Sequence, residues 1–150
     1  MKIISENRKA KFEYFIEKKY IAGIVLFGNE VKSIKKNKIS IKESYIKIIE
    51  NEVFLINCTI SKLEETNSFY EINEKRNRKL LLNKREIKHL KKELSVKGKT
   101  IIPLKIFLNE NNLIKLEIGL GKGKKIYDKR QDIKEKDLKR RKEDYWYLPK

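Results

Sequence analysis

Hydrophobic and polar positions alternate along this chain in several short runs, a pattern typical of half-buried β-strands. The clearest run covers residues 113–120, where every second residue from Ile114 to Leu120 is aliphatic and Lys115 and Glu117 fall between them. Four other runs are rich in β-branched and aromatic residues and short enough for strands. They are residues 16–27, 44–49, 53–60 and 100–108. The pattern therefore predicts a protein that is mainly β.

The runs at residues 100–108 and 113–120 are separated by the sequence Asn-Glu-Asn-Asn at residues 109–112. Because Asn favours turns, these two strands are predicted to pair as a hairpin. Pro103 cannot donate a hydrogen bond to a neighbouring strand, so it is expected near a strand start or on a sheet edge. The apolar alternation stops after Leu120, which is the expected end of the sheet.

A helix is predicted from Asn83, which can act as the N-cap, with Glu86 three residues later completing a capping box. Gly98 is expected at the left-handed position just after this helix. The residues at helical spacing that would face the core are Ile87, Leu90 and Leu94. The sequence thus carries both a start signal and an apolar stripe for this helix.

A second, shorter helix is predicted to begin near Asn29, with Val31 and Ile34 facing inward and the lysines at 32, 35 and 36 facing outward. Five or six short strands with two helices are too few for a sandwich. A small closed or partly closed barrel buries one sheet face and removes most edges, so this architecture is preferred. Polar residues 64–79 are predicted to form a long loop over the barrel.

Charge narrows the choice of partner. The formal net charge is +17, from 38 Lys or Arg and 21 Asp or Glu. Such an excess repels itself unless a polyanion neutralises it, so RNA, DNA and anionic membrane are the candidate partners. Residues 121–142 alone hold eleven Lys or Arg and four Asp or Glu.

The basic C-terminal segment lacks a continuous apolar stripe, although acidic and basic residues four apart favour a helix. Residues 1–125 are therefore predicted to form the folded body, and residues 126–150 a tail that is disordered when free and helical when bound. The alternative is a solvated tail that only improves solubility. Three adjacent aromatic residues at 145–147 argue against it, because exposed aromatic area is costly without a surface to stack on.

Catalytic, metal-binding and cofactor-binding motifs are not found. The glycines at 119, 121 and 123 lack the spacing of a phosphate-binding loop, and they are expected to end the strand or to let the backbone approach RNA. One histidine, His89, and one cysteine, Cys58, do not form a zinc ligand set. Cys58 is expected to be an inert buried thiol. Glu13, Glu17, Glu30 and Glu43 show no clustering for Mg²⁺.

Nothing at the start of the chain predicts export or membrane insertion. The first twelve residues lack the apolar region of a signal peptide. The longest apolar stretch, residues 21–28, is far shorter than the roughly twenty residues that cross a bilayer. A soluble, cytoplasmic protein without membrane partners, cofactor or enzymatic activity is expected.

Several motifs occur in an order that resembles the small protein B family, the tmRNA-binding proteins of bacterial trans-translation. They are NRKA at 7–10, YFIE at 14–17, AGIVL at 22–26, GNEVKSI at 28–34, RKLLLNKREI at 78–87 and GKGKKIYDKRQDIKEKD at 121–137. The resemblance covers nearly the whole chain. It implies an oligonucleotide/oligosaccharide-binding-like (OB-like) barrel of about six strands with two or three flanking helices and a basic tail.

The resemblance also implies partners and a function. Members of the family bind the tRNA-like domain of tmRNA and enter the empty A site of a stalled ribosome. The tail then lies in the vacant mRNA channel against 16S rRNA. Through tmRNA, elongation factor Tu and alanyl-tRNA synthetase become candidate partners. An RNA-processing enzyme or a generic RNA chaperone that uses the barrel as a platform is the alternative.

The resemblance assigns roles to individual residues. The tmRNA-binding positions fall at Asn7, Leu81, Lys115, Lys122, Lys124 and Lys125. The decoding-centre segment corresponds to Asp128, Lys129 and Arg130, preceded by Tyr127. In the tail, phosphates of ribosomal RNA would be met by Lys134, Lys136, Lys139, Arg140 and Arg141.

Three positions depart from the family pattern. Ile21 stands where Glu is common, which removes one polar contact expected with RNA. Phe12 and Tyr127 stand where many members have His, so stacking is retained but a role that depends on protonation is not.

Overall fold

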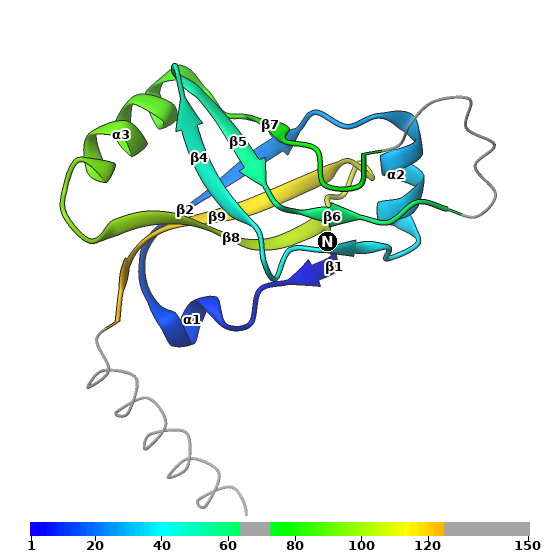
Figure 1. The fold of residues 1–150 in the computed structure, drawn as a ribbon, viewed down its shortest axis with the longest axis horizontal. Coiled ribbons are helices and arrows are strands. Elements are labelled where there is room, and N and C mark those ends of the chain that lie inside the picture. Colours follow the sequence, from blue (N-terminus) through cyan, green and yellow to red (C-terminus); the bar gives the residue numbers. More distant parts are fainter. Residues whose placement is uncertain (64–72, 125–150) are drawn as a thin grey trace, which may run out of the picture.

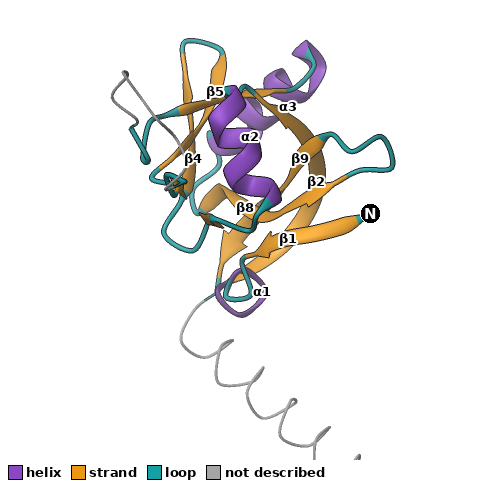
Figure 2. Cartoon of the chain, turned by 90° about the vertical axis from the view of Figure 1, so that its right-hand side faces the viewer, coloured by secondary structure: helices purple, strands orange, loops and turns teal. Residues whose placement is uncertain are grey.

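The computed structural model describes residues 1–63 and 73–124, and these form a strongly curved β-sheet with three helices around it (Figures 1 and 2). In chain order the elements are β1 (Lys2–Glu6), α1 (Ala10–Glu13), β2 (Tyr14–Ile24), α2 (Gly28–Lys35), β3 (Ile39–Ser40), β4 (Tyr45–Ile49), β5 (Glu52–Ile56), β6 (Thr59–Ile60), β7 (Arg78–Leu81), α3 (Lys84–Leu94), β8 (Lys99–Leu108) and β9 (Ile114–Gly123).

Seven strands form one antiparallel sheet in the order β1-β8-β9-β2-β7-β5-β4, and β3 pairs with β6 separately. The sheet curls until its last strand, β4, lies against β8. No ladder joins β1 to β4 among the described residues, so the barrel is partly open. The predicted mainly β barrel is confirmed, although the described part of the chain has more strands than the six expected.

The core fills the concave side of this sheet. Leu55, Ile106, Leu116 and Ile118 meet there and are almost completely buried, as are the other members of this cluster. Leu90 of α3 and Ile34 of α2, each 0% exposed, bring the two longer helices onto the same core. Burial of this apolar area is the main force that holds the sheet in its curved shape.

The predicted hairpin between β8 and β9 is confirmed. Its turn is closed by hydrogen bonds from the Asn109 N–H to the Leu113 carbonyl (2.9 Å) and from the Asn112 N–H to the Asn109 carbonyl (3.0 Å). Asn112 has a φ of 59°, a left-handed conformation that Asn tolerates better than most residues. The Asn-rich turn and the alternating apolar positions therefore predicted this part of the sheet correctly.

Other strand predictions need correction. The run 53–60 is two strands, because Asn57 adopts a φ of 61° and breaks it into β5 and β6. β9 does not end at Leu120 but continues to Gly123, paired there with Tyr14 of β2. β1, β3 and β7 were not predicted, and β7 begins within the stretch that was predicted to be a loop.

Pro103 is in the middle of β8 rather than at its start. It pairs with Ile118 of β9, and the ladder shifts register immediately afterwards. On the other side, the β1 pairing ends at Glu6 opposite Lys105. Pro103 therefore lies just beyond the end of its neighbour, a local edge where its missing N–H costs no ladder bond.

The capping box of α3 is present as predicted. The Glu86 N–H donates to Asn83 Oδ1 (2.8 Å), and the Asn83 N–H donates to Glu86 Oε1 (3.1 Å). Gly98 has a left-handed φ of 88°, but the helix already ends at Leu94 with Ser95 as its C-cap, so Gly98 belongs to the turn before β8. The predicted C′ position was therefore wrong.

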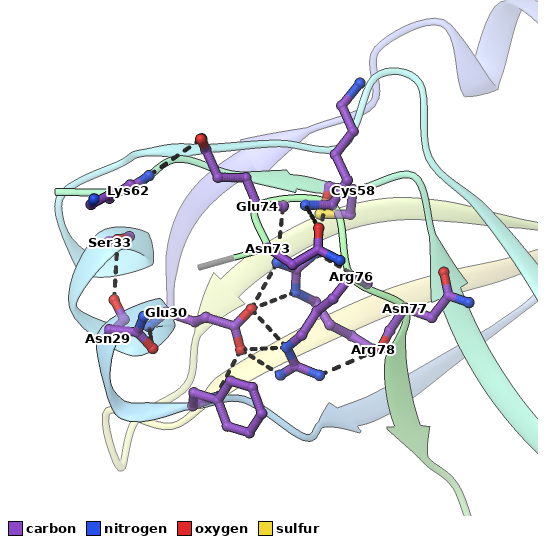
Figure 3. A network of polar contacts seen from close by, with 12 residues as sticks. Asn29, Glu30, Ser33, Cys58, Lys62, Asn73, Glu74, Arg76, Asn77 and Arg78 are labelled. Atoms are coloured by element: carbon purple, nitrogen blue, oxygen red, sulfur yellow. Dashed lines mark hydrogen bonds and ion pairs between the residues drawn. The ribbon is translucent and has the colours of Figure 1, made fainter. Parts of the chain in front are cut away.

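The second predicted helix is α2, with Ile34 fully buried, Val31 half-buried and the three lysines exposed. Its least expected member is Glu30, only 4% exposed. Figure 3 shows the Glu30 carboxylate facing Arg76 and Arg78. These two arginines lie more than 40 positions later in the sequence. Arg78 is 0% exposed, so this is a buried ion-pair network.

Several hydrogen bonds satisfy the charges of this network. Arg78 donates to Glu30 Oε2 from Nη2 (2.7 Å) and Nε (2.9 Å), and its Nη1 donates to the Cys58 carbonyl (2.6 Å). Arg76 donates to both Glu30 oxygens, and the Phe27 N–H adds another bond (2.8 Å). Burial by itself raises the pKa of Glu30, but the bonds from Arg76, Phe27 and Arg78 outweigh it and hold that pKa below its usual value. Glu30 is thus a structural carboxylate.

Cys58 lies beside this network with 0% of its surface exposed. Burial raises the pKa of its thiol to about 11. Since the thiolate is the reactive form, the thiol is unreactive near neutral pH. The predicted burial of Cys58 is confirmed, and the raised pKa supports the prediction that the thiol is inert.

Two glycines of β9 allow close packing between strands, whereas their expected approach to RNA stays a prediction. A Cβ on Gly121 would lie 2.8 Å from the Phe15 carbonyl oxygen, and one on Gly119 would lie 3.0 Å from Leu104 Cδ1. Gly123 has nothing within 4 Å of the same position. The first two glycines therefore let β2 and β8 pack closely around β9.

Replacing Gly121 by Ala is expected to destabilise the fold by about 1–3 kcal/mol, the usual cost of overpacking. The measurement is urea-induced unfolding. Gly123→Ala is the matched control, and it is expected to be neutral or slightly stabilising, because Gly costs roughly 0.5–1 kcal/mol relative to Ala in a strand. Equal stability of the two variants would contradict this role for Gly121.

Candidate nucleic-acid interface

The convex face of the sheet brings two of the predicted RNA-binding residues into one row. Gly23 of β2 pairs with Leu81 of β7 on one side and with Lys115 of β9 on the other. Directly paired residues point to the same face of a sheet. A Cβ on Gly23 would lie 3.3 Å from Leu81 Cβ, so Leu81 leans across the space that glycine leaves. Leu81 is 54% exposed and Lys115 is half-buried.

Apolar side chains continue on this face along β2 and at Val25, just after its end. Tyr20 and Ala22 point into the core, whereas Ile21 and Val25 are 50% and 42% exposed. Ile21, where the family pattern commonly has Glu, pairs directly with Glu117 of β9. A carboxylate therefore remains on this part of the face, supplied by the neighbouring strand. Such a mixture of apolar and charged side chains is suited to unstacked bases and phosphates.

Asn7 lies further along the same face, between β1 and α1. Its N–H donates to the Leu104 carbonyl (2.7 Å), and its side-chain Nδ2 donates to the Pro103 carbonyl (3.1 Å). Both bonds attach the end of β1 to β8, so Asn7 also has a structural role.

Next to Asn7 the surface is hollowed by about 70 Å³. Lys105 and Lys19 reach Glu117 from either side, with Nζ to carboxylate oxygen distances of 3.2 and 3.9 Å. The hollow is lined by Glu6, Asn7, Arg8, Lys11, Ile16, Lys19, Leu104, Lys105 and Glu117. Sequence reasoning missed the four cations of this group, because they come from separate elements. For Lys19 and Lys105 the available signal was their polar position within a strand, which places them on the outer face together with Glu117.

The two lysines that the structure describes after Leu120 differ in their surroundings. Lys122 is exposed. Lys124 is held against the body, since its N–H donates to the Glu13 carbonyl (2.8 Å) and its Nζ to the Lys11 carbonyl (2.9 Å). Its Nζ also lies 4.8 Å from the centre of the Phe15 ring. Lys124 therefore fixes the backbone where β9 ends, in addition to any contact with RNA.

The remaining predicted site residues lie outside the described residues. They are Lys125, the decoding-centre group Tyr127, Asp128, Lys129 and Arg130, and the tail group Lys134, Lys136, Lys139, Arg140 and Arg141.

Within residues 1–63 and 73–124, no group of three or more His, Cys, Asp or Glu side chains is placed to hold a metal ion. His89 instead packs near Tyr20, with ring centres 6.3 Å apart. Phe12, the other departure that the structure describes, is half-buried in α1.

None of the helices in the described part of the chain is long and apolar enough to cross a membrane.

Comparison with known proteins gives one consistent result. The chain matches the protein family described as "SmpB protein" over residues 4–146. It is 53% identical over 140 residues to the SsrA-binding protein of Acholeplasma laidlawii (strain PG-8A), covering 93% of each chain. It is 50% identical over 139 residues to the SsrA-binding protein of Rickettsia bellii (strain OSU 85-389), covering 93% of this chain and 91% of that one.

A solved structure supports the same relationship. One chain of the structure described as "tmRNA-SmpB: a journey to the center of the bacterial ribosome" superposes with a TM-score of 0.64 and 40% sequence identity. The match covers 81% of this chain and 84% of the other.

Proposed function

This chain belongs to the SmpB family, and we propose that it is an SsrA-binding protein that binds tmRNA and acts in the trans-translation rescue of stalled ribosomes. The observation that carries this proposal is the family match over residues 4–146, which includes both the barrel and most of the basic C-terminal segment. The net charge of +17 suits two RNA partners, tmRNA and the ribosome.

The convex face of the sheet is the proposed binding surface for the tRNA-like domain of tmRNA. Leu81 offers an exposed aliphatic surface to an unstacked base, and Lys115 beside it offers a cation to phosphate. Asn7 extends the same surface toward β1, and Lys122 adds charge at the end of β9. Lys124 and Lys125 remain proposed contacts from the basic segment that follows.

Residues 126–150 have a second partner, the ribosome. Residues 1–125 form the body that binds tmRNA, and the tail binds the ribosome. In the A site, Tyr127, Asp128, Lys129 and Arg130 contact the decoding centre. The basic residues beyond them follow the empty mRNA channel and neutralise 16S rRNA phosphates. These contacts offset the entropy cost of ordering the tail, so the tail becomes ordered on the ribosome.

The protein acts as an adaptor rather than as an enzyme, without a cofactor. It works in the cytoplasm, where ribosomes translate. Elongation factor Tu and alanyl-tRNA synthetase join the complex through tmRNA and do not require a separate site on this chain.

The direct test is to identify the RNA that the protein holds in cells. The tagged chain is expressed in a bacterium that lacks its own SsrA-binding protein, and the co-purified RNA is sequenced. We expect tmRNA to be strongly enriched over its cellular abundance. Recovery of tRNA, rRNA and mRNA in proportion to abundance would instead indicate a generic RNA chaperone, and shortened tmRNA would indicate a processing enzyme.

A further inference from the structure

The hollow beside Asn7 holds more positive charge than its own carboxylates neutralise. Four cations and two carboxylates line it, which leaves an excess of two positive charges. Glu117, whose side chain is 12% exposed, pairs with Lys19 and Lys105. Arg8 and Lys11 have no ion pair with any residue that the structure describes. Like charges held this close repel one another, so an anion in the hollow would stabilise the arrangement.

The hollow is large enough for a small anion. One water needs about 10–15 Å³ of this kind of space. The volume of about 70 Å³ therefore has room for several water-sized positions, enough for a phosphate group. Ile16 and Leu104 form the apolar part of the lining and belong to a small cluster packed around Ala10 of α1. This cluster gives the hollow a firm base.

Asn7 adds a hydrogen-bond acceptor at the edge of the hollow. Its Nδ2 is already committed to the Pro103 carbonyl, which fixes the orientation of the amide. Its Oδ1 accepts no hydrogen bond from the described residues and remains available for a donor. A phosphodiester carries no proton at neutral pH and cannot donate a hydrogen bond to Asn7 Oδ1. The donor must therefore be another group of the RNA. The donor that accompanies every phosphate of an RNA chain is the ribose 2′-hydroxyl.

We propose that this hollow binds one phosphodiester of tmRNA, with Arg8 and Lys11 as the main cations, and that Asn7 Oδ1 accepts a hydrogen bond from a neighbouring ribose 2′-hydroxyl. The proposal rests on the proposed function and names a site within its RNA-binding surface. Lys19 and Lys105 are positioning residues here, because Glu117 holds them at the rim. The site distinguishes RNA from DNA without reading a base.

The phosphate contact is tested by the salt dependence of tmRNA affinity. Arg8→Ala/Lys11→Ala is compared with Lys32→Ala/Lys35→Ala, which removes the same charge from exposed positions on α2, a helix at the other end of the molecule from α1 in Figure 1. Neutralising one phosphate contributes about 0.9 to the slope of log affinity against log salt concentration. The first variant is therefore expected to lose about 0.9 of slope, and the control to keep the wild-type slope. Equal slopes for the two variants would overturn the phosphate site.

The hydroxyl contact is tested by replacing single riboses of the tRNA-like domain with deoxyribose. For each position, the ratio of ribose to deoxyribose affinity is measured with the wild-type chain and with Asn7→Ala. At one position the wild type is expected to show a several-fold ratio that falls to one in Asn7→Ala. Any effect of Asn7→Ala on folding cancels within its own ratio. If no position shows this loss, the assignment of Asn7 is wrong.

The phosphate site in the hollow and the binding of tmRNA by the chain can be contradicted separately. A wild-type chain that does not prefer tmRNA over other RNA contradicts the proposed function. A wild-type chain that selects tmRNA, combined with an unchanged slope in Arg8→Ala/Lys11→Ala, contradicts only the site in the hollow.

Discussion

Replacing Glu30 by Gln is expected to destabilise the protein by about 3–5 kcal/mol, because it leaves a buried arginine without its counter-ion. Arg78 is 0% exposed and donates twice to Glu30 Oε2, and the neutral amide cannot balance its charge. Equilibrium unfolding in urea at neutral pH gives the difference in free energy of unfolding between wild type and variant.

The control for this prediction is a salt bridge at the surface. Glu52→Gln breaks the Lys79–Glu52 pair (3.2 Å), whose side chains are 44% and 51% exposed. Exposed pairs contribute about 0–1 kcal/mol, so this variant should unfold close to the wild type. If Glu30→Gln were as stable as Glu52→Gln, the buried network would not hold β7 to α2 as described.

The same carboxylate gives a prediction about pH. Since the folded-state pKa of Glu30 is below its usual value of 4.5, its contribution to stability is complete above that value and is lost as pH falls through the lower, folded-state pKa. Wild type should therefore lose stability more steeply than Glu30→Gln when urea unfolding is repeated below about pH 4.5. Parallel curves would show that Glu30 is not ionised in the folded protein.

Ending the chain at Lys125 is expected to abolish the tagging of proteins on stalled ribosomes while leaving tmRNA affinity close to that of the full chain. The convex face and the hollow beside Asn7 lie entirely within the described residues, so they are retained. The deleted segment contains the residues proposed to meet the decoding centre and the mRNA channel. Filter binding to tmRNA and a tagging assay with purified ribosomes measure the two activities separately.

A chain with residues 126–150 in scrambled order controls for charge. It keeps the composition of the tail and any nonspecific attraction to RNA. It is expected to bind tmRNA normally and to fail in tagging. Loss of tmRNA binding together with tagging in the truncated chain would refute the separation of the two roles.

Local signals predicted the parts of the fold that local physics determines. The β8–β9 hairpin and the capping box of α3 depend on residues within a few positions of one another. β7 could not be predicted in this way, since it begins with an inward-facing arginine. That arginine is buried only because Glu30, 48 positions away, meets it. A charge pair over this separation leaves no periodic trace in the sequence.

The binding surface was only partly predictable, because it combines residues that are distant in the sequence. The family resemblance supplied Leu81 and Lys115, and the structure shows that Gly23 brings them together. The hollow depends on how β1, α1, β2, β8 and β9 meet, which alternation within one strand does not reveal. The signal from Gly119 and Gly121 was ambiguous, because close packing between strands and close approach to RNA both favour glycine.

As an SsrA-binding protein, this chain should recognise tmRNA as a folded RNA rather than simply attract polyanions. The most direct measurement is its affinity for tmRNA, for tRNA and for an unrelated RNA of equal length at several salt concentrations. Selective recognition predicts that tmRNA binds most tightly and that its advantage persists at high salt, where the charge contribution is weak. Equal affinities for the three RNAs, falling together as salt rises, would contradict the claim.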